Sequence, residues 1–248
     1  LSVPNIDGNE WKYVKECLDS GWISSAGSYV NKFENLIAKY VGARYGVACM
    51  NGTVGLYISQ KVIGIQNDNY VIAPNLTFVA TLNSIKYTGA RPILIDICPE
   101  TWQMDLDLLE NFLENNTTLK VKNNITISVL KSDGKKIGAI MPVHVLGNML
   151  DIQRLIFISK KYHIPIVEDS TESLGTFYKT KHSGTFGTLG VFSFNGNKII
   201  STGGGGVIVT NDKELAIKAK HLSNQAKVQG SLEYFHDEIG YNFRLVNV

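Results

Sequence analysis

Short apolar runs alternate with helix-length amphipathic segments along most of this 248-residue chain. The runs expected to form strands are 45–50, 70–73, 92–96, 137–143, 164–168, 189–194 and 206–210. The segments expected to form helices are 8–19, 33–40, 54–63, 78–87, 106–113, 152–162 and 212–222, with Asp212 as the N-cap of the last. This alternation predicts a three-layer α/β/α fold with a mostly parallel central sheet.

Residues 115–136 break the alternation, because they are polar and β-branched and contain the turn signal Ser132-Asp133-Gly134. We interpret them as an inserted surface hairpin. Residues 1–248 otherwise read as one large α/β domain with a helical segment at the N-terminus.

Composition excludes several classes of function. A net charge of +2 gives no electrostatic reason to expect a nucleic-acid or membrane partner, and no apolar run is long enough to cross a bilayer. Cys17, Cys49 and Cys98 are an odd and widely spaced set without metal-ligand spacing. They indicate reduced thiols and a cytoplasmic protein.

Residues 192–209 contain the strongest chemical signal, because Lys198 stands between an apolar run and the glycines 203–206. A lysine is usually a solvated surface residue, and four glycines can form only a flexible turn. Glycines also let the backbone approach a flat ligand closely, and a desolvated lysine attacks carbonyls readily. Lys198 is therefore a candidate nucleophile.

Asp169 ends the apolar run 164–168. Such an aspartate is often a helix cap or turn former. Together with Lys198, it matches what pyridoxal phosphate needs: a lysine for the Schiff base and a carboxylate that keeps the pyridine nitrogen protonated. Glu168 points to the opposite face if the strand continues, so one of the two carboxylates faces the ring.

Other residues after predicted strands supply the remaining contacts of a flat, phosphorylated ligand. Asn51-Gly52-Thr53 follows a strand and opens a helix, which suits a phosphate, although Thr53 could equally be a simple cap. Ser193 is a second candidate phosphate contact, and Phe78 could stack on a ring or belong to the core. His144 is expected to be a hydrogen-bonded structural histidine.

These stretches together resemble the DegT family of pyridoxal-phosphate-dependent nucleotide-sugar aminotransferases, which have the aspartate-aminotransferase-type fold. The similar stretches are 21–25, 51–53, 74–81, 142–144, 168–173, 192–198 and 240–244, in the order of the family. The resemblance implies that Lys198 carries the cofactor and that Asp169 pairs with its ring nitrogen. It also implies phosphate contacts from Gly52, Thr53 and Ser193, and stacking by Phe78.

Two further site residues come from the resemblance alone. Asn242 corresponds to an asparagine that reaches the phosphate of the neighbouring subunit, which implies a homodimer with shared active sites. Glu172 stands where many members have a glutamine near the ring hydroxyl, and Asn51 stands where a serine is common. Full members continue into a smaller C-terminal domain, so residues 223–248 are expected to begin the connection to it.

The resemblance implies transfer of an amino group from glutamate to a nucleotide-linked 4-keto-6-deoxy sugar, for amino sugars of surface glycans. The amino-acid sequences of 21–25 and 194–198 are most similar to those of enzymes that aminate C4 of a UDP-linked sugar. Two alternatives remain open. One is a non-catalytic module that binds the cofactor or a nucleotide sugar; the other is a Rossmann-type dehydrogenase, although its glycine fingerprint is missing.

Overall fold

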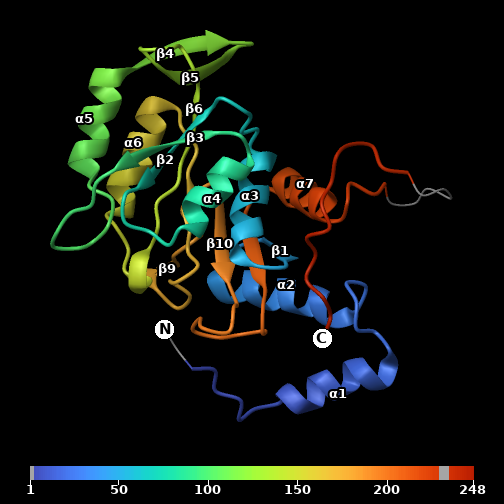
Figure 1. Cartoon of the computed structure of the whole chain (residues 1–248). Coiled ribbons are helices and arrows are strands. Elements are labelled where there is room, and N and C mark those ends of the chain that lie inside the picture. The colour runs from blue at the N-terminus through green and yellow to red at the C-terminus, as the bar shows by residue number, and fades with distance from the viewer. Residues whose placement is uncertain (1–2, 229–234) are drawn as a thin grey trace.

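The computed structural model describes residues 3–228 and 235–248 and has helices on both faces of a central sheet (Figure 1). The predicted three-layer α/β/α fold is therefore confirmed. No helix among the described residues is long and apolar enough to span a membrane.

The strands of the central sheet form two hydrogen-bonded groups, which isolated bridges connect. One set has the order β1-β11-β10-β7 and the other the order β3-β2-β6. Parallel bridges from Ile140 to Ile166 and from Val143 to Asp169 connect β6 with the β7 segment. The strands are β1 (Tyr45–Cys49), β2 (Tyr70–Pro74), β3 (Arg91–Ile95), β6 (Ile137–Ile140), β7 (Val167–Asp169), β10 (Leu189–Ser193) and β11 (Gly206–Thr210).

The direction of the strands decides where loops gather. β2 is parallel to β3 and β6, and β10 is parallel to β7. β11 runs antiparallel to both β1 and β10, so β1 and β10 point the same way. The sheet is thus mostly parallel, as predicted, and the carboxyl ends of β1, β7 and β10 lie at one edge.

Most helices begin and end within three residues of the predicted positions, but the helix predicted at 33–40 begins at Ser28, five residues earlier. They are α1 (Glu10–Ser20), α2 (Ser28–Val41), α3 (Gly52–Val62), α4 (Ala80–Tyr87), α5 (Leu106–Asn116), α6 (Ile152–Tyr162) and α7 (Lys213–Ser223). Asp212 caps α7 as expected, because its carboxylate accepts hydrogen bonds from the amides of Glu214 and Leu215. Helix α3 begins at Gly52, two residues before the predicted start.

Alternating side chains of each strand enter two different cores. Val71 and Ala73 pack with α3, α4 and α7, whereas Ile72 between them packs with α5 and α6. In β11, Ile208 joins the first core, and its neighbours Val207 and Val209 pack against α2. One layer therefore holds α3, α4 and α7, and the other holds α2, α5 and α6.

The inserted hairpin is confirmed, but its turn lies elsewhere. β4 (Thr117–Lys122) pairs antiparallel with β5 (Ile125–Leu130), and Figure 1 shows this ribbon projecting from the body. Its turn is Asn123-Asn124, both with positive φ, as a type I′ turn requires. The predicted turn at Ser132-Asp133-Gly134 instead joins β5 to β6. A second small ribbon, β8 (Phe177–Tyr178) with β9 (Lys181–His182), was not predicted.

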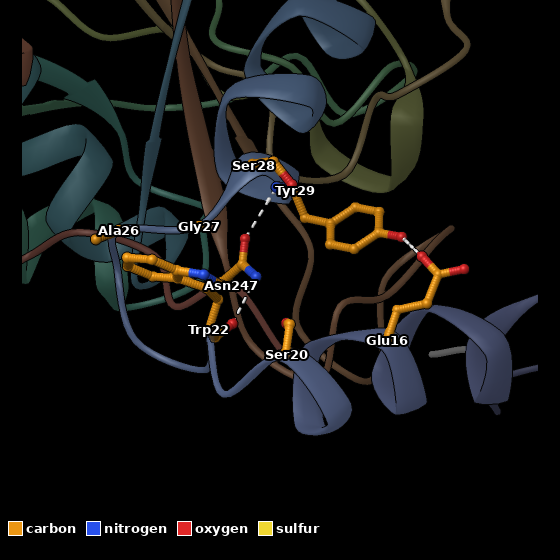
Figure 2. A pocket seen from close by; sticks show the side chains of 8 residues that line it. All are labelled: Glu16, Ser20, Trp22, Ala26, Gly27, Ser28, Tyr29 and Asn247. Carbon is orange, nitrogen blue, oxygen red and sulfur yellow. Dashed lines mark hydrogen bonds between the residues drawn. The ribbon is translucent and has the colours of Figure 1, made fainter.

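Helix α1 lies outside the three layers (Figure 1), and the C-terminal segment contacts the loop that follows it. Asn247 donates to the Trp22 carbonyl at 2.7 Å and accepts from the Tyr29 amide at 2.9 Å. It lines a cavity of about 450 Å³ with Glu16, Ser20, Trp22, Ala26, Gly27, Ser28 and Tyr29 (Figure 2). Residues 229–234 of the predicted connection at 223–248, and residues 1–2, lie outside the described part of the chain.

Candidate active site

Three of the predicted site segments follow the strand ends that share one edge of the sheet. Asn51 and Gly52 come after β1, Asp169 is the last residue of β7, and Ser193 is the last residue of β10. Asp169 is in register with Val191 of β10, two residues before Ser193. The parallel arrangement therefore brings together residues that are far apart in the sequence.

Asp169 is a buried carboxylate, 3% exposed, on the side of the sheet covered by α4. Its Oδ2 accepts a hydrogen bond from the Thr81 hydroxyl at 2.7 Å, and its Oδ1 accepts one from the Thr171 amide at 3.2 Å. The Thr81 hydroxyl is also 2.7 Å from that of Thr77. These bonds hold the carboxylate in one direction, as a partner for a protonated ring nitrogen must be held.

Lys198 is mostly buried, with 17% of its side chain exposed, so it is not the ordinary surface lysine. Its Nζ lies 3.4 Å from Oε1 of Glu172, and Oε2 of Glu172 accepts a hydrogen bond from the Leu146 amide at 2.8 Å. The structure therefore brings Lys198 and Glu172 together. Glu172 lies three residues after Asp169, so the amine and the buried carboxylate belong to one locality.

Gly52, the first residue of α3, lies against the segments that contain Thr171 and Ser193. A Cβ at this position would lie 3.0 Å from Cγ2 of Thr171 and 3.1 Å from Cβ of Ser193. Only glycine leaves this space open, and the predicted contacts Gly52 and Ser193 are brought together. The opening amides of a helix have no partner within it and its dipole favours an anion, so α3 begins where a phosphate can be held.

The cap of α3 is Asn51, because its side chain accepts a hydrogen bond from the Val54 amide at 3.0 Å. The simple capping role considered for Thr53 thus belongs to Asn51, which leaves the half-buried Thr53 for other contacts. Cys49, just before the cap, is fully buried, and burial raises the pKa of its thiol to about 12. Cys49 is therefore no nucleophile at neutral pH.

Phe78 does not open the helix as predicted, because α4 begins at Ala80. It belongs to the turn between β2 and α4, where its carbonyl accepts a hydrogen bond from the Thr81 amide at 3.1 Å. Phe78 is 72% exposed, so the core alternative for it is excluded within this chain. Its ring is available to a ligand or partner.

Asn242 is exposed, and none of the hydrogen bonds among the described residues joins it to Lys198 or Asp169. Its neighbour Phe243 accepts a hydrogen bond from the Met50 amide at 2.9 Å, which ties this segment to the end of β1. Tyr241 and Phe243 stack with an interplanar angle of 9°. Asn242 thus lies on a surface beside the β1 end rather than inside the site.

Glu168 faces the other layer, as the strand alternation predicts, and is fully buried. The Nε2 of His144 lies 3.0 Å from its carboxylate, so the structural role expected for His144 is confirmed. Glu168 also accepts hydrogen bonds from three backbone amides, which were not predicted from the sequence. The signal that could have revealed them is the run Gly184 to Gly187, where two glycines precede a strand.

Comparisons with known proteins match almost the whole of this chain. The model of the DegT/DnrJ/EryC1/StrS aminotransferase family matches residues 4–248. GDP-perosamine synthase of Escherichia coli O157:H7 is 41% identical over 99% of this chain and 62% of its own length. The putative pyridoxal phosphate-dependent aminotransferase EpsN of Bacillus subtilis is 39% identical over the whole chain and 60% of its own length.

Solved structures show the same fold. A DegT DnrJ EryC1 StrS aminotransferase from Brucella abortus has a TM-score of 0.84 at 27% identity, over 95% of this chain and 59% of its own. The putative sugar aminotransferase Spr1654 from Streptococcus pneumoniae, in its PLP-form, has the same TM-score at 26% identity over 99% and 62%. This chain thus spans about 60% of the length of the curated relatives it matches. The matched residues and the shared fold show that the chain belongs to the DegT/DnrJ/EryC1/StrS aminotransferase family.

Proposed function

We propose that this chain forms the large domain of a pyridoxal-phosphate-dependent enzyme that transfers an amino group from glutamate to a nucleotide-linked 4-keto-6-deoxy sugar. The observation that carries the proposal is the placement of a mostly buried amine, Lys198, beside the segment of the buried carboxylate Asp169. The product would be an amino sugar for surface glycans, made in the cytoplasm.

The residues fit the cofactor. The space that a Cβ at Gly52 would fill is bounded by Thr171 and Ser193, which suits a phosphate held by Gly52, Thr53 and Ser193. Asp169 would pair with the ring nitrogen, the exposed ring of Phe78 would stack, and Glu172 would contact the ring hydroxyl. When bound, pyridoxal phosphate supplies an electron sink for the carbon that loses its proton.

The protein's own groups would do the rest. The amine of Lys198 would hold the cofactor and then act as general base and acid, removing a proton from Cα of glutamate and returning one to C4 of the sugar. Asp169, fixed by the Thr81 hydroxyl, would keep its negative charge beside the ring nitrogen throughout. The low exposure of both groups would limit competing protonation by water.

The relatives support the substrate class, because their names describe nucleotide-sugar chemistry. They include GDP-perosamine synthase from several bacteria and UDP-2-acetamido-2-deoxy-3-oxo-D-glucuronate aminotransferase from Pseudomonas aeruginosa. These names contain both GDP and UDP, so the UDP-linked sugar predicted from the sequence is one of two nucleotides to test. No contact among the described residues favours the non-catalytic module.

We also propose that the enzyme is a homodimer in which Asn242 reaches the phosphate bound by the partner subunit. The exposed position of Asn242 beside the β1 end supports this reading. In this proposal, residues 223–248 begin the connection to a smaller C-terminal domain. Such a domain would account for the greater length of the relatives. Sedimentation of the intact protein tests the assembly, and pyridoxal phosphate binding by Asn242→Ala tests the shared contact.

The test of the function is an absorbance spectrum with pyridoxal phosphate, before and after borohydride, followed by peptide mapping. We expect a band in the violet region that borohydride abolishes, with the cofactor attached to Lys198. Lys198→Ala should abolish turnover and retain some cofactor binding through the phosphate contacts. Normal turnover by that variant, or a label on another lysine such as Lys179, would overturn the assignment.

A further inference from the structure

Glu168 is a fully buried carboxylate on the side of β7 that faces away from the candidate active site. Oε2 accepts the Nε2–H of His144 at 3.0 Å and the Gly184 amide at 2.8 Å. Oε1 accepts the amides of Phe186 at 2.7 Å and Gly187 at 2.6 Å. Four donors therefore converge on one carboxylate, two on each oxygen.

The donors come from two loops that contact β7 on either side. His144 follows β6, and Gly184, Phe186 and Gly187 belong to the connection between β9 and β10. A buried carboxylate without hydrogen-bond donors is strongly unfavourable, so this arrangement is stable only with its donors in place. Successive backbone amides around an anion form such a concave donor set. Glu168 thus joins three segments of the chain at one point.

The segment after β6 also holds the main chain of Asp169. The amide of Asp169 donates to the Pro142 carbonyl at 2.9 Å, and its carbonyl accepts from the His144 amide at 3.1 Å. His144 therefore contacts Glu168 through its ring and Asp169 through its amide. Movement of Glu168 would shift His144, and with it the main chain from which the Asp169 carboxylate projects.

We propose that Glu168 is a positioning residue, which acts through the β7 main chain to fix the direction of the Asp169 carboxylate on the opposite face. This inference rests on the proposed function, because the direction of Asp169 matters when it pairs with a ring nitrogen. Glu168 touches neither cofactor nor substrate. Its contribution is to hold the end of β7 against the loop after β6 and the connection between β9 and β10.

The test compares two cofactors on two proteins. One cofactor is pyridoxal phosphate and the other is its carbocyclic analogue, with CH in place of the ring nitrogen. We expect Glu168→Gln to weaken pyridoxal phosphate binding about tenfold, the lower end of what loss of an outer-shell partner costs at metal sites. Binding of the analogue should change less than twofold, because the analogue has no nitrogen for Asp169 to reach. Glu114→Gln, an exposed position on α5, is the matched control.

The outcomes separate the possible explanations. If Glu168→Gln weakens the binding of both cofactors equally, Glu168 supports the fold generally, and the proposal is wrong. Failure of the unaltered protein to bind pyridoxal phosphate would refute the proposed function itself. If Glu168→Gln does not fold, His144→Leu removes one of the four donors and keeps the backbone bond to Asp169. The same selective loss is then expected, and equal or absent loss contradicts the proposal.

Discussion

The Nζ of Lys198 lies 3.4 Å from Oε1 of Glu172, whose second oxygen accepts the Leu146 amide. Leu146 has a φ of 53°, a conformation that a side chain disfavours, so Glu172 joins the lysine to a strained turn. The residue that departs from the common glutamine is thus an ion-pair partner of the candidate nucleophile.

This pair predicts that Glu172→Gln speeds the reaction of pyridoxal phosphate with Lys198. The ion pair holds the Lys198 amine against Glu172, and this contact must break before the amine can attack the aldehyde. A partly exposed pair contributes at most about 1 kcal/mol, so the increase is expected to be about fivefold or less. Stopped-flow absorbance at neutral pH measures it. An unchanged or slower rate, with Glu114→Gln as control, would contradict the prediction.

The bond from Thr81 to Asp169 predicts a loss of stability in Thr81→Val. Removing the hydroxyl leaves Oδ2 of a buried carboxylate without this donor, and hydrogen bonds to charged groups contribute about 1.5–3 kcal/mol. Urea unfolding of the cofactor-free protein measures the free energy of unfolding. Thr88→Val is the control, since that hydroxyl donates to the neutral Ile85 carbonyl. Equal losses in the two variants would show that the charge of Asp169 is not involved.

Asn247 predicts that the C-terminal segment stabilises the start of α2. The N-cap position of α2 is Gly27, which has no side chain, and Asn247 supplies the missing acceptor to the Tyr29 amide (Figure 2). Asn247→Ala should lower the free energy of unfolding by about 1–2 kcal/mol. Asn9→Ala is the control, because Asn9 stands at the start of α1 without a side-chain cap bond. A loss no larger than that of Asn9→Ala would refute the capping role.

His182 predicts a fall in stability as the pH is lowered. Burial lowers the pKa of His182 below 6.5. Its Nε2 accepts a hydrogen bond from the Gly175 amide at 2.8 Å, so a proton on Nε2 would face the N–H of Gly175 and break this bond. Below pH 6.5, His182 binds a proton in the unfolded chain but not in the folded chain. Stability should therefore decrease by up to about 1.4 kcal/mol per pH unit until the lowered folded pKa is passed.

The variant His182→Phe isolates this contribution, because a ring remains between Phe177 and Phe192 and the titrating group is gone. Its free energy of unfolding should depend less on pH between 7 and 5 than that of the unaltered protein. His163→Asn is the control, since His163 is exposed and asparagine tolerates its left-handed backbone. An unchanged slope in His182→Phe would place the pH dependence elsewhere.

Secondary structure followed from local signals wherever the period was clear. Helix α6 occupies the predicted residues, and Asp212 caps α7, because periodicity and capping depend on neighbours in the sequence. The ribbon β8–β9 and the turn at Asn123-Asn124 were missed, since short strands carry little periodic signal. The capping alternative considered for Thr53 is wrong, because Asn51 supplies the side-chain cap of α3.

The sequence by itself determined the three-layer order and the candidates Lys198, Asp169, Gly52 and Ser193, because residues after parallel strands meet at one edge of the sheet. Only the tertiary structure decided which groups touch. The contacts of Lys198 with Glu172, of Asp169 with Thr81 and of Glu168 with two loops join residues 16 to 88 positions apart. Such contacts depend on side-chain direction and burial, which no local pattern contains.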